Sequence, residues 1–248
     1  MSELQHPESR PFELVADVYE RARPEYPPEA INWVAERLDL RPGRTVLDLG
    51  AGTGKLTRSL MTTGARVVAV EPGEAMLAQL RQSVPGVEAL QGAAEEIPLP
   101  DASVDAITIG QAFHWFRHDE AVPELSRVLR EGGAVALLWN NRDPDDPLQS
   151  EVTELIRQLP AGRARIEHTS SYLMESGLFA RIEERRFSFV QELDADGLVE
   201  RVASISYVAA APPDERVELE RNVRALVAAH GGRITFPYIA DVYLSRAV

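Results

Sequence analysis

The stretch with the clearest chemical meaning is residues 46–54, VLDLGAGTG, which sets three glycines directly after a short hydrophobic run. Glycine permits positive φ and lets a ligand approach the backbone closely. Asp48 ends that run, and Glu71 ends the next one, VVAVEP. A carboxylate has two acceptor oxygens and can take both hydroxyls of a ribose. This combination predicts a site for an adenosine ligand without phosphates.

Two phosphate-binding motifs with similar glycine content do not fit. The dinucleotide fingerprint GxGxxG would need a glycine at position 55, where the sequence has Lys55. A P-loop would need a glycine at position 49 and a serine or threonine at position 56, and both positions are leucine. An NAD-type oxidoreductase therefore remains only as an alternative.

Alternating strands and helices must position this loop. We expect strands in RTVLDLG, ARVVAVEP, VEALQG, SVDAITIGQAF and GGAVALLWN. We expect helices in EAINWVAERLDL, KLTRSLMTTG, GEAMLAQLRQSV and DEAVPELSRVLR. This order implies right-handed βαβ units, so the fold class is α/β: a doubly wound, Rossmann-like, mostly parallel seven-stranded sheet with helices on both faces. Ligands of such sheets bind beyond the carboxyl ends of the strands.

The pattern changes after Asn140. A turn-rich loop, NNRDPDDP, precedes a helix in PLQSEVTELIRQL and an alternating strand in RIEERRFSFVQEL. Two more helices follow, and GRITFPYIADVYLSRAV is the last strand. We expect the two late strands to form an edge hairpin whose helical insertion covers the site. The organisation is then an N-terminal cover segment over 1–40, a cofactor-binding core over 41–140, and the rest of the same domain over 141–248.

These motifs resemble those of the class I S-adenosylmethionine-dependent methyltransferases. VLDLGAGTG matches their first motif, VVAVEP matches their second, and GAAEEIPLPDASVDAITIGQAFHWF is similar to the third and fourth. The resemblance implies that Glu71 binds the ribose and that Asp48 supports the loop or the ammonium group. Since Ala93 stands where many members have an aspartate, the adenine contact falls to the Ala94 backbone and Glu95. The further cofactor contacts that it implies are Gly50, Ala51, Gly52, Gly54, Pro72 and Gln111.

Three flanking segments are similar to the small-molecule branch that includes trans-aconitate methyltransferase-like proteins: YERARPEYP, QAFHWF and LWNNRD. In that branch the N-terminal segment folds over the cofactor, which would put Tyr19 and Arg23 near its methionine end. The alternative for this pair is a surface turn with an aromatic anchor. QAFHWF stands where methyltransferases acting on adenine or glutamine amino groups carry Asn/Asp-Pro-Pro-Tyr/Phe, which disfavours that chemistry.

The resemblance implies methyl transfer to a small organic acceptor, most readily at a carboxylate or hydroxyl oxygen. For a hydroxyl acceptor, His114 is the candidate base, because its reference pKa lies near neutrality. For a carboxylate acceptor no proton need leave, and Arg142 or Arg23 could hold it bidentately. Trp115 and Trp139 are further candidate substrate contacts. The alternatives are a structural histidine, core aromatics and a solvent-exposed turn.

Composition narrows the partners. The formal net charge of −13, from 39 acidic and 26 basic residues in 248, disfavours nucleic acid. No apolar run approaches the roughly 18 residues of a membrane span, and the first residues lack a secretory h-region, so we expect a cytoplasmic protein that does not bind membranes.

Metal and redox chemistry find little support in the sequence. There is no cysteine, and the histidines show no metal-ligand spacing, so no metal is predicted. We expect a monomer or weak homo-oligomer with S-adenosylmethionine as its cofactor. A non-catalytic or regulatory protein that binds the adenosyl cofactor is the second alternative.

Overall fold

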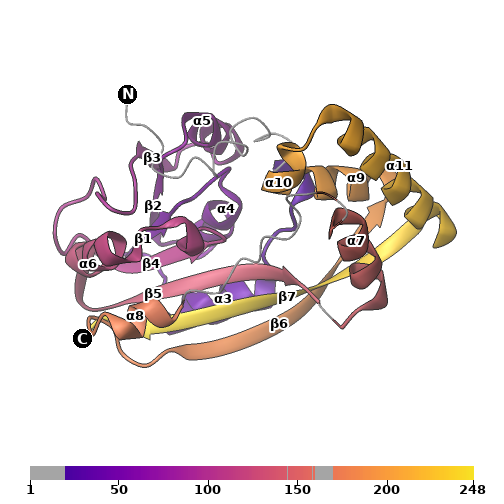
Figure 1. Ribbon diagram of the computed structural model, residues 1–248. Coiled ribbons are helices and arrows are strands. Elements are labelled where there is room, and N and C mark those ends of the chain that lie inside the picture. Colours follow the sequence, from indigo (N-terminus) through magenta and orange to yellow (C-terminus); the bar gives the residue numbers. More distant parts are fainter. Residues whose placement is uncertain (1–19, 144, 158, 160–169) are drawn as a thin grey trace. The chain divides into compact units, whose positions relative to one another are not determined.

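The computed structural model describes residues 20–143, 145–157, 159 and 170–248, which contribute to a seven-stranded sheet of order β3-β2-β1-β4-β5-β7-β6 (Figure 1). The strands are β1 (Thr45–Leu49), β2 (Arg66–Glu71), β3 (Glu88–Gln91), β4 (Val104–Gly110), β5 (Leu129–Arg142), β6 (Glu183–Asp194) and β7 (Arg233–Arg246). The helices are α3 (Pro28–Arg37), α4 (Lys55–Met61), α5 (Glu74–Ser83), α6 (His118–Val128), α7 (Pro147–Arg157), α8 (Ser171–Glu175), α9 (Ala195–Ala203), α10 (Ser206–Ala209) and α11 (Pro213–Ala229), and η2 (Phe113–Trp115) is a 3₁₀ turn.

The predicted mostly parallel sheet is confirmed. β3, β2, β1, β4 and β5 pair in parallel, and the two pairs that involve β7 are antiparallel. β6 and β7 are neighbours at the sheet edge with α9, α10 and α11 between them in the chain, as expected for the late hairpin.

Some predicted boundaries were wrong. The fourth strand was expected to run through Phe113, but β4 ends at Gly110 because Gln111 has φ +58° and turns the chain into η2. The fifth strand begins directly after α6, at Leu129, and continues to Arg142 instead of ending at Asn140. The short helix α8 was not predicted.

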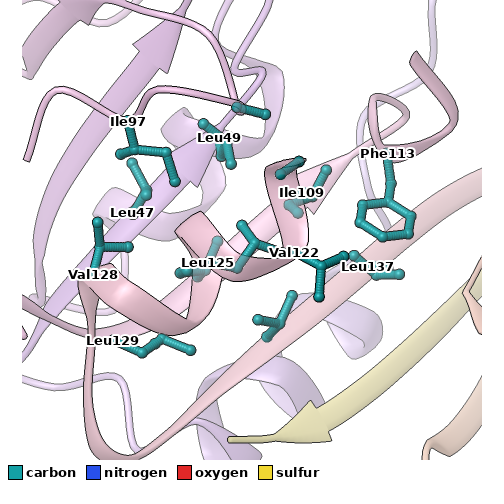
Figure 2. Packing of buried hydrophobic residues seen from close by; sticks show 14 of the residues in the cluster. Leu47, Leu49, Ile97, Ile109, Phe113, Val122, Leu125, Val128, Leu129 and Leu137 are labelled. Carbon is teal, nitrogen blue, oxygen red and sulfur yellow. The ribbon is translucent and has the colours of Figure 1, made fainter. Parts of the chain in front are cut away.

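Helices cover both faces of the parallel part of the sheet. Successive strand residues point to opposite faces. On β1, Leu47 and Leu49 enter a hydrophobic cluster with Leu125 of α6, as Figure 2 shows. Asp48, between them, points the other way and bonds Thr57 of α4. The two faces of β1 therefore carry different helices, as a doubly wound sheet requires.

The chain divides into two compact units, which we describe separately. One comprises residues 25–140, 167–187 and 240–248, and holds the parallel strands, the glycine loop and the cluster of Figure 2. The other comprises 1–24, 141–166 and 188–239, and has its own core around Val202, Val223 and Phe236. α3 belongs to the first unit, although the sequence placed it in the N-terminal cover segment. We call the unit with the parallel strands the core unit and the other the insertion unit.

An ionic cluster fastens the amino ends of three neighbouring strands in the core unit. Asp105 of β4 accepts hydrogen bonds from Thr45 N (2.8 Å), Arg44 Nη1 (3.0 Å) and Arg130 Nη1 (2.7 Å). Burial acts to raise the pKa of Asp105, but the bonds from Thr45 and Arg130 outweigh it and hold that pKa below its usual value. Asp105 is therefore ionised at neutral pH and ties β1 and β5 to β4.

Within the described part of the chain, no helix has the length and apolar character needed to cross a bilayer.

Candidate cofactor site

Glu71 lies at the carboxyl end of β2 and bonds directly to the glycine loop. Its Oε2 accepts a hydrogen bond from Gly52 N (2.9 Å), and its Oε1 accepts one from Gly73 N (2.9 Å). Glu71 is 8% exposed, so both contacts are shielded from water. A carboxylate oxygen can accept more than one hydrogen bond. Through these two contacts, the Glu71 carboxylate orders the glycine loop.

The three loop glycines are required for different reasons. All have positive φ: +68° at Gly50, +58° at Gly52 and +94° at Gly54. A Cβ on Gly50 would stand 2.7 Å from Ala112 Cβ, and one on Gly54 would stand 2.9 Å from Val84 Cγ2. A Cβ on Gly52 would have no described atom within 4 Å. The sequence predicted that all three approach the ligand, but only Gly52 faces open space.

Asp48 lies beneath the loop. It is 1% exposed, its Oδ2 accepts a bond from Thr57 Oγ1 (2.6 Å), and its Oδ1 lies 3.4 Å from Thr108 Oγ1. Burial raises the pKa of Asp48 to about 7, partly offset by the hydrogen bonds from Thr57 and Thr108. Of its two predicted roles, these contacts suit loop support, because they direct the carboxyl into the protein.

A short segment before α3 is anchored to the same end of the sheet. Glu25 Oε1 binds Lys55 Nζ (3.1 Å) and Arg58 Nη2 (2.7 Å), both on α4. Asn140 Nδ2 donates to the Glu25 carbonyl (3.3 Å). A Cβ on Gly110 would stand 2.5 Å from Tyr26 Oη, so Tyr26 occupies the space that this glycine leaves at the end of β4. From the sequence, Lys55 was only evidence against a dinucleotide-binding motif, and its ion pair with Glu25 was not predicted.

Gln111 connects the ends of β4 and β5. Its Nε2 donates to the Asn140 carbonyl (3.2 Å), and its backbone N donates to Leu138 O (2.9 Å). A non-glycine residue at positive φ is strained, and such strain gathers at functional sites. Gln111 is thus held where the sequence predicted a cofactor contact.

His114 and Trp139 meet at the same strand ends. Trp139 Nε1 donates to His114 Nδ1 over a long 3.4 Å. With Nδ1 accepting, a neutral His114 carries its proton on Nε2, which makes that nitrogen a donor. Trp139 is 2% exposed, and its ring packs edge-on against Tyr243 at 5.6 Å. The indole therefore belongs to the core, and it exposes little surface for the substrate contact that the sequence predicted.

The aromatic residues of the QAFHWF segment divide into core and partly exposed residues. Phe113 is fully buried and packs edge-on against Phe116 at 5.8 Å. Phe116 also lies beside Gly50, since a Cβ there would come within 3.5 Å of its ring. Trp115 is partly exposed and its ring lies 4.8 Å from that of His114.

The predicted adenine contacts have structural partners. The Ala94 side chain is buried in the cluster of Figure 2, which leaves its backbone as the predicted contact. Glu95 Oε1 accepts a bond from Arg117 N (2.8 Å), at the start of α6. The Pro72 carbonyl accepts a bond from Gln91 Nε2 (3.2 Å).

The remaining predicted residues lie outside the core unit or outside the described residues. Tyr19 is not among the described residues. Arg23 belongs to the insertion unit, where Nε donates to Ser204 Oγ (3.0 Å) and Nη2 to Ser204 O (3.1 Å). Arg142 ends β5 and also belongs to the insertion unit.

Among the described residues, no group of three His, Asp or Glu side chains is placed to hold a metal ion. The acids near the glycine loop instead bind backbone N–H groups, hydroxyls or cations.

Comparison with known proteins agrees with this geometry. Residues 47–137 match the model of a methyltransferase domain family. The chain is 41% identical to an uncharacterized methyltransferase of Mycobacterium tuberculosis over 92% of both proteins. The solved structure of a candidate type II methyltransferase of Anaeromyxobacter dehalogenans is 26% identical, with a TM-score of 0.67, over 90% of this chain and 97% of that one.

A third comparison gives likeness of fold alone. Phosphoethanolamine N-methyltransferase 2 of Haemonchus contortus, solved with S-adenosylhomocysteine, is 15% identical with a TM-score of 0.55, over 98% of this chain and 58% of that one. The match to the Mycobacterium tuberculosis methyltransferase extends over nearly the whole of both proteins. Taken with the fold and the glycine loop, it shows that the chain belongs to the class I S-adenosylmethionine-dependent methyltransferases.

Proposed function

We propose that this protein transfers a methyl group from S-adenosylmethionine to a small organic acceptor, at a carboxylate or hydroxyl oxygen. The observation that carries the proposal is the arrangement of Glu71 and Gly52. A buried carboxylate at the end of β2 holds a backbone amide whose α-carbon faces open space. The similarity to trans-aconitate methyltransferase-like proteins remains a prediction from the sequence.

The residues at the strand ends fit the cofactor. Glu71 would take the ribose hydroxyls, and Gly52 would let the methionine portion pass close to the backbone. Ala51, Pro72, Gln111, and the Ala94 backbone with Glu95 complete the proposed contacts. When bound, the cofactor supplies a methyl group on an already activated sulfonium. The protein's task is then to align the acceptor with that methyl and to exclude water.

His114 fits a donor role better than that of a general base. With Nδ1 accepting from Trp139, a neutral His114 carries its proton on Nε2, and an N–H group at that position would donate to an acceptor oxygen. A donor suits a carboxylate acceptor, which has no proton to lose. Turnover of a His114→Ala variant at the wild-type rate would remove this side chain from the mechanism.

The decisive experiment replaces Glu71. Glu71→Gln keeps the shape but loses one acceptor oxygen, and its NH₂ group then faces a backbone N–H donor. The affinity for S-adenosylhomocysteine, measured by calorimetry, should fall by about 1–3 kcal/mol, or roughly 10- to 100-fold. Methyl transfer to a panel of small acids and phenols should fall with it.

Glu88→Gln is the matched control, because Glu88 lies on the neighbouring strand β3 and is exposed. It should bind S-adenosylhomocysteine like the wild type. Tight binding of NAD in place of S-adenosylhomocysteine would favour the oxidoreductase alternative. Cofactor binding without turnover of any acceptor in the panel would favour a regulatory protein.

A further inference from the structure

Arg142 in the insertion unit lacks an expected acidic neighbour among the described residues that shift its pKa most. None of those residues is an Asp or Glu. Arg142 ends β5, and its Nη1 is buried without a hydrogen-bond partner in the described part of the chain. A buried, unpaired guanidinium nitrogen costs folding free energy, since it gives up water and gains nothing in exchange.

The surroundings of Arg142 are cationic and phenolic. Its pKa is lowered, chiefly by burial and then by the nearby charge of Arg201, with Arg157 adding to the effect; Tyr207 and Tyr238 act in the opposite direction. Arg201 is 5% exposed, its Nε donates to Tyr238 Oη (2.7 Å), and its guanidinium lies 5.7 Å from the Tyr238 ring centroid. The partly buried Arg142 therefore lies within electrostatic reach of the buried Arg201.

Other arginines of this protein are paired with acidic side chains. Arg127 binds Glu124 and Asp101, and Arg224 binds Asp196 and Glu220, and in each case the acids raise the arginine pKa. The shift at Arg142 has the opposite sign. A bound anion would offset the cost of keeping Arg142 near Arg201 without an acidic partner among the residues that influence it most.

We propose that Arg142 and Arg201 bind a small organic oxyanion. A planar guanidinium matches the paired oxygens of a carboxylate or phosphate, and the Tyr207 hydroxyl could add a further hydrogen bond. The inference rests on the proposed function in one respect: it implies that the methyl acceptor is an anion. It deepens the earlier hypothesis for Arg142 by adding Arg201, Tyr207 and Tyr238, which the sequence did not indicate.

The test compares acids with their neutral amides on the full chain. The probes are benzoate and succinate, their amides benzamide and succinamide, and phenyl phosphate, each titrated by calorimetry with and without S-adenosylhomocysteine. We expect at least one anion to bind the wild type and its neutral counterpart to bind at least about tenfold more weakly. The carboxylate and phosphate arms show which anion the site prefers.

Variants locate the site. Arg142→Gln should weaken anion binding at least about tenfold, whereas Arg221→Gln, the same charge change at an exposed position of α11, should not. Arg142→Met removes a partly buried cation whose Nη1 has no partner among the described residues, so its melting temperature should rise by about 2–4 °C while anion binding is lost. A merely structural arginine would show the reverse thermal shift.

Four results would overturn the inference: equal binding of acids and amides, no anion binding up to roughly 10 mM, wild-type affinity in Arg142→Gln, or a lower melting temperature in Arg142→Met. None of these depends on methyl transfer. Failure of the methyltransferase proposal would appear separately, as absent binding of S-adenosylhomocysteine to the wild type.

Discussion

At the scale of single residues, the three glycines of the loop are required for different physical reasons. Gly50 and Gly54 avoid collisions with Ala112 and Val84, so they serve packing. Gly52 has no neighbour to avoid and is held by Glu71. The positive φ of +58° favours glycine at this position, and the proposed passage of the cofactor would give a second reason.

This difference predicts a dissociation between stability and binding. Gly54→Ala combines positive φ with the 2.9 Å approach to Val84, so the free energy of unfolding should fall by about 2–4 kcal/mol in urea titrations. Gly52→Ala carries only the backbone cost of about 1–2 kcal/mol. It should nevertheless lose most of the affinity for S-adenosylhomocysteine in calorimetry. Wild-type affinity in Gly52→Ala would mean that the ligand does not pass this α-carbon.

At the scale of elements, the carboxyl ends of β4 and β5 are joined to the segment before α3. Tyr26, 7% exposed, fills the space beside Gly110, while Glu25 bridges to Lys55 and Arg58 on α4. Lys55 is itself 8% exposed, so its pairing with Glu25 offsets the cost of burying an ammonium group. Packing and charge together hold the segment at the glycine loop.

A double-mutant cycle tests this coupling. Gly110→Ala should lower the free energy of unfolding by about 1–3 kcal/mol, because the new methyl meets Tyr26 Oη. Adding Tyr26→Phe removes the hydroxyl and should recover part of the loss, although Leu56 Cδ2 at 3.1 Å limits the recovery. Chemical denaturation of the four proteins gives the coupling energy. Strictly additive effects would show that the two residues do not meet.

At the scale of the whole molecule, the buried Asp48 and the partly buried Asp105 have opposite effects on the pH dependence of stability. Asp105, with its lowered pKa, adds stability at neutral pH that is lost as pH falls through its folded pKa. Asp48, with a pKa of about 7, keeps its proton when folded while the unfolded chain has already lost it. Stability should therefore decline as pH rises from about 4 to 7. Self-repulsion from the net charge of −13 acts in the same direction.

Asp48→Asn isolates the contribution of this carboxyl group. The amide can accept from Thr57 and donate toward Thr108, so the fold should persist. Between pH 5 and pH 8 the wild type should lose about 2–3 kcal/mol of unfolding free energy relative to the variant, measured in urea. Asp119→Asn, at an exposed position of α6, is the control for net charge and should follow the wild type. Parallel curves for wild type and Asp48→Asn would contradict the buried titration.

The sequence by itself determined the alternation of strands and helices, the parallel sheet and the meeting of Glu71 with the glycine loop. These features follow from local periodicity and from the handedness of βαβ connections, which need no knowledge of distant contacts. Only the tertiary structure decided that Gly52 is the loop glycine that faces open space, that Trp139 lies in the core, and that Arg201 lies near enough to act on Arg142. Such relations join residues far apart in the chain, and they depend on how side chains pack, which hydrophobic spacing does not encode.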